Sequence, residues 1–243
     1  MKTLLFKEIN AFLSSLVGYI AIGVFLLVNG LLLWIFPGAY NIFDSNYAGL
    51  GSMFLLAPVV FLFLIPAITM KAFAEEKKSG TIELLFTKPI TDFQIILAKY
   101  IAGVVLVLFS LLPTLVYFYC VYQLGAEKGN IDMGGLWGSY LGLLFLGSGF
   151  VAIGIYASSI TDNQIISFLF GMLMCAFCFY GFEIISYMGL FGSGDSAILK
   201  LGINEHYISM SRGVIDTRDL IYFLSLITVF LLLTKYQLNR RKN

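Results

Sequence analysis

Charged residues are scarce in this sequence. Only 12% of its 243 residues are Asp, Glu, Lys or Arg, whereas 59% are apolar and the mean hydropathy is +0.91. A water-soluble domain usually has about 25% charged residues and about 45–50% apolar ones. The composition therefore excludes an ordinary soluble domain and indicates an integral membrane protein.

Residue types that usually catalyse reactions or bind metals are also rare. The chain has one histidine, His206, and three cysteines, Cys120, Cys175 and Cys178, which all fall within apolar runs. No cluster of His, Cys and carboxylates has the spacing of a metal site, and no disulfide framework is recognisable. The glycine-rich phosphate-binding loop that ends in Lys-Ser or Lys-Thr is absent. We therefore expect no catalytic residue, metal or cofactor, and no ATP hydrolysis by this chain.

Six apolar runs are long enough to be transmembrane helices. About 20 mostly apolar residues cross about 30 Å of hydrocarbon, so we predict an all-α integral membrane protein that forms one domain over residues 1–243. Kinks are expected at Pro58 and Pro66, inside the second run, and the glycine-rich fourth run favours close helix packing. The predicted spans are Leu16–Phe36, Gly49–Met70, Ile95–Tyr122, Leu136–Ala157, Ile165–Leu190 and Leu220–Tyr236.

The segments outside the spans indicate their orientation. Residues 1–15 have apolar side chains at helical spacing, which predicts a helix lying on the membrane surface. Most basic residues fall near the two termini or in the loop 71–94, so the positive-inside rule places both termini, this loop and the loop 158–164 in the cytoplasm. The segment 191–219 is then on the outer side, and it is too polar to span the membrane.

The loop 71–94 has the highest density of charge and contains a predicted short helix. Gly80 begins the helix, Glu83 lies in its first turn, Lys88 lies near its end and Pro89 stops it. Exposed apolar patches usually mark a contact surface, so one interpretation is a docking helix for a soluble partner. The other is that its apolar side chains fold back onto the protein or the membrane interface. These side chains are Ile82, Leu84, Leu85 and Phe86.

Both inner loops end in nearly the same phrase. ITDFQI opens the third span and ITDNQI opens the fifth. In each phrase a threonine, Thr91 or Thr161, is followed three residues later by glutamine, which predicts a capping box. One interpretation is simply two well-capped helices, and the other is that rigid caps transmit a push from a cytoplasmic contact into the membrane. The second cytoplasmic contact would comprise Thr161, Asp162, Asn163 and Gln164.

Glu183 is the acidic residue that lies well inside a predicted span. An intramembrane carboxylate is costly and is a functional candidate by default. Its place near the outer end of the fifth span, beside Tyr180 and Tyr187, favours contact with the outer interface or a base of the outer segment over a substrate or proton site. The other candidate functional residues on the outer side are His206, Arg212 and Asp216.

The sequence of residues 75–90, EEKKSGTIELLFTKPI, resembles the E-x-x-x-G-T-x-E-x-L-x-T-x-P-(V/I) phrase of ABC-2-type permeases, the membrane subunits of one class of ATP-driven exporters. The phrase lies between the second and third spans, where that family has it, and the resemblance extends over the whole chain. The outer phrase 205–216 looks like the one before the last span in a subgroup that includes the permease of the gliding-motility-associated ABC transporter.

This resemblance implies a permease subunit in the bacterial cytoplasmic membrane that works with a separate ABC ATPase subunit. The ATPase would bind ATP and would receive a coupling helix in a groove, with residues 158–164 as a lesser contact. The coupling residues implied are Gly80, Thr81, Ile82, Glu83, Leu84, Leu85, Phe86, Thr87 and Pro89.

Other partners also follow from the resemblance. The six spans would pair with a second membrane subunit, either a copy or a paralogue, and a partner with a periplasmic domain is a further option, whereas nucleic acid is not expected. The cargo and the direction of transport are not indicated. Two alternatives stay open: a non-transporting subunit that transmits force to a periplasmic partner, and an ion-coupled secondary transporter, which would need more intramembrane ionisable groups.

Overall fold

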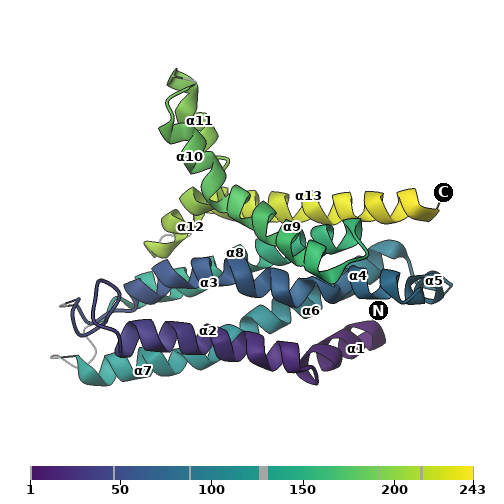
Figure 1. Ribbon diagram of the computed structural model, residues 1–243. Helices are drawn as coiled ribbons and strands as arrows, with labels where there is room; N and C mark the ends of the chain where they lie inside the picture. Colours follow the sequence, from purple (N-terminus) through teal and green to yellow (C-terminus); the bar gives the residue numbers. More distant parts are fainter. Residues whose placement is uncertain are drawn as a thin grey trace.

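The computed structural model of the chain is an elongated bundle of helices (Figure 1). It describes residues 2–45, 47–87, 89–125, 131–190, 192–213 and 216–242, without the side chains of residues 17, 86, 193, 241 and 242. Helices and turns make up these residues, with no strand among them, so the predicted all-α class is confirmed. The helix α1 (Lys2–Leu13), the short helix α5 (Thr81–Phe86) and the C-terminal end of α13 (Thr217–Lys242) lie at one end of the bundle, which we call the α5 end.

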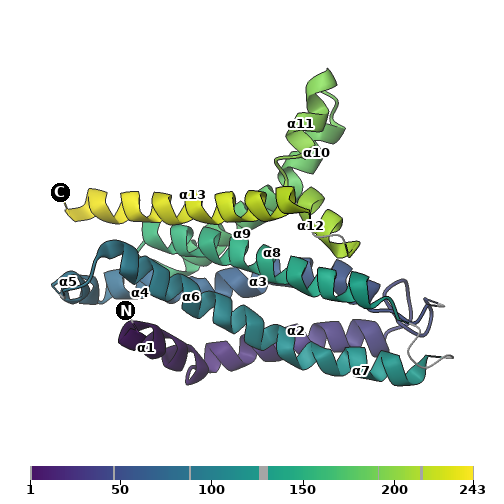
Figure 2. The ribbon, with the colours of Figure 1, turned by 180° about the vertical axis from the view of Figure 1, so that it is seen from behind.

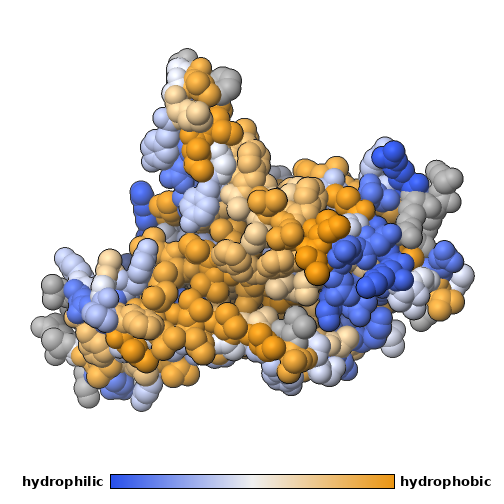
Figure 3. All heavy atoms as spheres, viewed as in Figure 1, coloured by the Kyte–Doolittle hydropathy of each residue, from blue (hydrophilic) through white to orange (hydrophobic). Residues whose placement is uncertain are grey.

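Five helical stretches among the described residues are long and apolar enough to cross a membrane. A sixth is added if α1 and the helix after it, α2 (Leu16–Trp34), count as one stretch bent by 60°. Figure 3 shows an apolar surface along the middle of the bundle and hydrophilic residues toward the α5 end. The chain is therefore a multi-pass membrane protein. The five stretches are Gly51–Lys78, Asp92–Leu124, Met133–Ile160, Gln164–Tyr187 and Thr217–Arg240.

The second predicted span continues into the charged loop that follows it. α3 (Gly51–Thr69) runs as one helix through Pro58 and Pro66, and after Met70 the chain continues as α4 (Lys71–Lys78). The first part of the segment 71–94 is therefore a helical extension of the span rather than a loop. A turn then leads into α5.

The third predicted span is interrupted near its middle. α6 (Asp92–Leu111) ends in a 3-10 turn over Leu112–Thr114, and α7 (Leu115–Leu124) completes the stretch. Pro113 lies within this turn and has no N–H for an α-helical hydrogen bond, which explains the local change of helix type.

α8 (Met133–Ile160) is the central helix and is largely buried. Seen from behind, it lies between α13 and α6 (Figure 2). A Cβ atom added at Gly147 would lie 2.7 Å from Val107 Cγ1 of α6, and one added at Gly154 would lie even closer to Thr69 of α3. The prediction that small residues in this span permit close helix packing is confirmed.

The fifth stretch leads to a part of the chain that leaves the bundle. α9 (Gln164–Ala176) continues through a π-helical turn, Phe177–Gly181, into α10 (Phe182–Tyr187). In Figure 1, α10 and α11 (Asp195–Leu199) stand away from the body. α12 (Ile203–Ser211) returns and packs on α8, where Tyr207 and Met210 contact Gly142. The outer segment thus contains helices that its polarity alone did not predict.

Candidate functional site

The turn between α4 and α5 has a fixed geometry. Gly80 has φ +71°, a left-handed conformation that favours glycine, and its N–H donates to the carbonyl of Lys77 at 3.2 Å. The hydroxyl of Ser79 donates to the carbonyl of Glu75 at 2.9 Å. α5 begins directly after Gly80 and has Glu83 in its first turn, so the predicted start of this helix is confirmed.

α5 has one buried face and one exposed face. Ile82 and Leu85, three residues apart, are only 2% and 7% exposed, because they pack into the hydrophobic core of the chain. The interpretation that they form an exposed contact surface is wrong, and the alternative that they fold back onto the protein is confirmed. Leu84 is 66% exposed. Its exposed neighbours are Thr81, Glu83, Thr87 and Pro89, whereas the Phe86 side chain and Lys88 lie outside what the structure describes.

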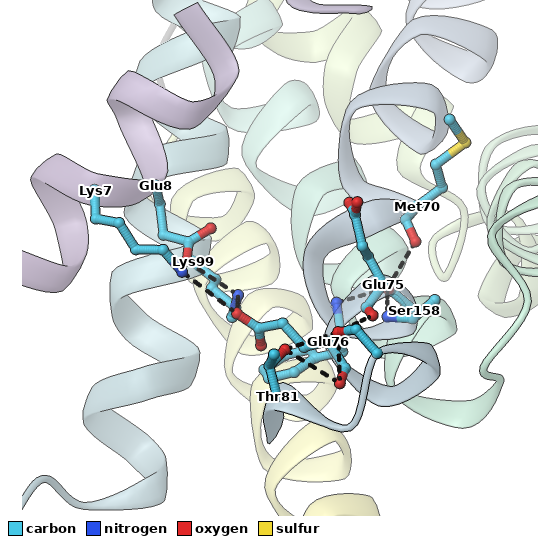
Figure 4. Close-up of polar contacts among 11 residues, drawn as sticks. Lys7, Glu8, Met70, Glu75, Glu76, Thr81, Lys99 and Ser158 are labelled. Atoms are coloured by element: carbon cyan, nitrogen blue, oxygen red, sulfur yellow. Dashed lines mark hydrogen bonds and ion pairs between the residues drawn. The ribbon is translucent and has the colours of Figure 1, made fainter. Parts of the chain in front are cut away.

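A buried ion cluster lies beside this helix pair (Figure 4). The Nζ atom of Lys99, on α6, is 2.9 Å from Glu76 Oε1 on α4 and 3.2 Å from Glu8 Oε1 on α1. Lys7 Nζ approaches the same two oxygens at 3.7 and 3.4 Å. The Lys99 side chain is only 2% exposed, so its charge depends on these carboxylates. The cluster connects α1, α4 and α6.

The sequence contains one signal for this cluster. Lys99 lies inside the predicted third span, and a charge at such a position is costly unless it is paired. The positive-inside rule uses Lys99 only as a basic residue on the inner side. Nothing in the local patterns singles out Glu8 or Glu76 as its partners.

Ser158 of α8 caps the first turn of α4 from another helix. Its Oγ accepts hydrogen bonds from the backbone N–H groups of Phe73 and Ala74, at 2.9 and 3.0 Å, and donates to the carbonyl of Met70 at 3.0 Å. The residue before α4, Met70, has no side chain that can cap it. Ser158 therefore takes the role that an N-cap residue usually has within its own helix. It joins the start of α4 to the end of α8.

The buried side chain of Lys77 makes a second connection between these segments. Its Nζ donates to the carbonyl of Ser159 and lies 3.9 Å from Asp162 Oδ1. Asp162 belongs to the loop that we predicted as a second cytoplasmic contact. The structure thus places part of this loop, which is largely exposed, directly beside α4.

The two predicted capping boxes differ. Thr91 accepts from the N–H of Gln94, whose side chain accepts from the N–H of Thr91, so the box at α6 is confirmed. The box at Thr161 and Gln164 is wrong, because Asn163 caps α9 by accepting from the N–H of Ile165 at 2.9 Å. Asparagine is a strong N-cap residue. Before α6, Phe93 stands at the position equivalent to Asn163. Its side chain has no hydrogen-bond acceptor, so Thr91 caps the helix there.

The predicted outer-side residues do not form one site. Asn204 Nδ2 donates to Glu183 Oε2 at 2.8 Å, so the partner of Glu183 in the described residues is an amide and not a base. His206 lies 2.7 Å from Asp219 and stacks on Tyr222, which ties α12 to α13. Asp216 Oδ1 accepts from the N–H of Arg218 at the start of α13. Arg212 is exposed at the end of α12.

The comparison with known families agrees with the membrane architecture. The model of the ABC-2 family transporter proteins matches residues 41–201, which include α3 to α11 and, from the ion cluster, Glu76 and Lys99. No curated protein matches the sequence significantly. Because the family match covers more than half of the 243 residues, the chain belongs to the ABC-2 family of membrane transport proteins.

Proposed function

We propose that this chain is the membrane-spanning permease subunit of an ABC-2-type exporter in the bacterial cytoplasmic membrane. A separate ABC ATPase binds and hydrolyses ATP, and it docks on the exposed face of α5, with residues 161–164 as a second contact. Both termini and the α5 end face the cytoplasm in this proposal, as the distribution of Lys and Arg indicates.

The exposed face of α5 is the observation that carries the proposal. Leu84 is a large apolar side chain with 66% of its surface exposed, at the hydrophilic end of the molecule. Ile82 and Leu85 hold the opposite face of the same helix in the core. A short helix that is anchored on one side and presents a large apolar side chain among polar ones on the other fits a groove in a soluble partner.

The contacts around α4 supply a route for movement. Lys99 connects α4 to α1 and α6, while Ser158 and Lys77 connect it to the end of α8. A displacement of α5 therefore acts on several membrane helices together. The charged groups in this route are buried, which makes their separation costly.

A second membrane subunit, identical or paralogous, completes the proposed transporter. α9 and α13 leave most of their surface exposed, whereas α8 is almost enclosed. Helices with apolar exposed faces can contact either lipid or another membrane subunit. The cargo stays unassigned.

The experiment compares Leu84→Asp with Leu201→Asp in the full chain. Each chain is purified from membranes of its native host, and P-loop ATPases that copurify are identified by mass spectrometry. We expect Leu84→Asp to lose the ATPase while it still inserts and purifies as well as the unmodified chain. Leu201 is a matched control, because it is also largely exposed (56%) but lies in the outer segment. Undiminished copurification with Leu84→Asp would contradict the docking proposal.

A force-transmitting role is the second candidate. α10 and α11 stand away from the bundle (Figure 1), where a periplasmic partner could bind them, and the phrase 205–216 resembles that of gliding-motility-associated permeases. In this second role the same ATPase moves a periplasmic partner instead of exporting a cargo. Deletion of residues 192–199 would then abolish gliding while ATPase binding persists, whereas normal gliding would exclude this role for the arm.

The ion-coupled alternative has less support. Such a transporter needs ionisable groups distributed through the bilayer. Glu183 is bonded to Asn204 near one end of the bundle, and Glu8 and Glu76 lie at the other. Glu183→Gln tests the alternative, because a proton relay through Glu183 requires that this substitution stop function without disturbing assembly.

A further inference from the structure

A cavity of about 400 Å³ lies where α10 leaves the bundle. Glu183 and Tyr187 line it from α10, and Asn204, Glu205 and Arg212 line it from α12. Volumes of about 300–1,000 Å³ are typical of small-molecule sites. The cavity therefore has room for a small polar group with its attached chain.

α12 separates this cavity from the core. Its buried side chains, Ile203, Tyr207 and Met210, face the bundle, while Glu205 and Arg212 lie on the cavity side. Arg212 lies seven positions after Glu205, which corresponds to about 10 Å along a helix. The two opposite charges thus lie toward the two ends of the cavity.

The charges in this cavity are available to a ligand. Glu183 accepts a hydrogen bond from Asn204 at Oε2, which leaves Oε1 to accept from a ligand. Glu205 and Arg212 are exposed, and neither forms an ion pair within the described part of the chain. Two carboxylates and one guanidinium are therefore free to bind groups of opposite charge.

The cavity lies at the end of a candidate membrane stretch. Phe179, Glu183 and Tyr187, which line it, are among the last residues of Gln164–Tyr187. The apolar side chains beside it are exposed, with Ile184 at 59% and Tyr187 at 81%. Exposed tyrosine at the end of an apolar helix is typical of the interface between hydrocarbon and headgroups.

We propose that this cavity binds the headgroup of a phospholipid that carries a primary ammonium group, such as phosphatidylethanolamine. The ammonium group donates hydrogen bonds to Glu183 and Glu205, and the phosphate accepts hydrogen bonds from Arg212. Phosphatidylglycerol has no ammonium group, and the two carboxylates repel its net negative charge. Phosphatidylcholine has the positive charge but no N–H donor, so both lipids bind more weakly.

The test titrates the purified full chain with lipids and measures the bound fraction by native mass spectrometry. Phosphatidylethanolamine, phosphatidylglycerol and phosphatidylcholine with identical acyl chains are compared. We expect phosphatidylethanolamine to bind about tenfold more tightly than the other two, which corresponds to one charge-assisted hydrogen bond. Equal affinities, or a preference for phosphatidylglycerol, would overturn the proposal.

Two variants assign the preference to this cavity. Glu183→Gln should reduce the preference for phosphatidylethanolamine severalfold, because Glu183 contacts the ammonium group. Arg212→Gln should instead weaken the binding of all three lipids severalfold, because all three carry the phosphate. Arg218→Gln is the matched control, because Arg218 is an exposed arginine near the same level that does not line the cavity. Arg212 is exposed, so its substitution leaves the fold intact. An unchanged preference in Glu183→Gln, or unchanged lipid affinities in Arg212→Gln, would overturn the assignment. The measurement needs no ATPase, so its outcome is independent of the docking experiment.

Discussion

The hydroxyl of Tyr207, on α12, donates a hydrogen bond to the backbone carbonyl of Phe54, on α3, at 2.6 Å. Pro58 explains this contact. In a regular helix the carbonyl of Phe54 would accept from the N–H of residue 58, but proline has no N–H. The tyrosine replaces the missing donor. Burial raises the pKa of the Tyr207 hydroxyl well above its usual range, so the group keeps its proton at physiological pH.

Removing this hydroxyl should destabilise the outer part of the bundle. Tyr207→Phe leaves a buried carbonyl without a donor, which costs about 1–3 kcal/mol. The expected result is a lower unfolding free energy in detergent, measured from thermal or denaturant unfolding. Tyr222→Phe removes a different tyrosine hydroxyl, one that donates to the carbonyl of Leu201 in the exposed turn after α11, and should cost less.

A double-mutant cycle attributes the cost to Pro58. Pro58→Ala restores a backbone N–H four residues after Phe54, so the carbonyl no longer needs the tyrosine. Tyr207→Phe should therefore cost less in the Pro58→Ala background than in the unmodified chain. Equal costs in both backgrounds would show that the hydroxyl does not compensate for the proline.

The buried lysine at the α5 end should be essential for stability. Lys99→Met leaves the carboxylates of Glu8 and Glu76 without their buried cation, with only the largely exposed Lys7 beside them. Losing one partner of such a buried group costs about 3–5 kcal/mol. The expected result is a large loss of folded protein in detergent. Lys78→Met is the control, because Lys78 is exposed on α4 and its substitution should change stability by no more than about 0.5 kcal/mol.

Neutralising the whole cluster should restore most of this stability. The triple variant Lys99→Met, Glu8→Gln, Glu76→Gln has no unpaired buried charge, and uncharged replacements of buried ion groups are often tolerated. If the triple variant is as unstable as Lys99→Met alone, the loss comes from the shape of the lysine side chain and not from unpaired charge. The same unfolding measurement separates these cases.

The contact between α8 and α12 should not tolerate a methyl group. A Cβ atom at Gly138 would lie 2.7 Å from the Cα of Gly213 and 2.9 Å from the carbonyl oxygen of Met210, and backbone atoms cannot move aside locally. Gly138→Ala should cost about 1–3 kcal/mol. Gly23→Ala, on α2, meets no atom within 4 Å and should be neutral or slightly stabilising. Equal stability of the two variants would contradict the close packing.

Local features of the site could be predicted from the sequence. Gly80 before Glu83 predicts the start of α5, and Thr91 before Gln94 predicts the cap of α6, because each signal and its effect lie within a few residues. The cap of α9 was mispredicted because two local signals compete there. Thr161 and Asn163 are both able to cap, and the pattern alone does not rank them.

Contacts between distant segments could not be predicted in this way. Lys99 lies 91 residues from Glu8, and Tyr207 lies 153 residues from Phe54. Their pairing depends on how the helices pack, which periodicity does not specify. The exposed and buried faces of α5 depend on packing too, so the sequence allowed two interpretations and the structure selected one for Ile82 and Leu85.

The cap that α8 provides for α4 gives the last prediction. Ser158→Ala leaves the N–H groups of Phe73 and Ala74 without the acceptor that holds them. Loss of an N-cap costs about 1 kcal/mol, so the first turn of α4 should open more often while the bundle stays folded. Hydrogen–deuterium exchange of peptides covering residues 71–78 should become faster by about fivefold to tenfold.

The control for this exchange measurement is Ser225→Ala. Ser225 is exposed on α13, and its hydroxyl donates only to the carbonyl of Tyr222 in its own helix, at 2.7 Å. This variant should leave the exchange of residues 71–78 unchanged.

Ser158→Ala also distinguishes binding of the ATPase from transmission of its movement, because Leu84 stays exposed and able to bind in this variant. We expect the ATPase to copurify normally while transport falls, because α5 is held but α4 no longer moves together with α8. Unchanged exchange in Ser158→Ala would show that α4 does not depend on this cap.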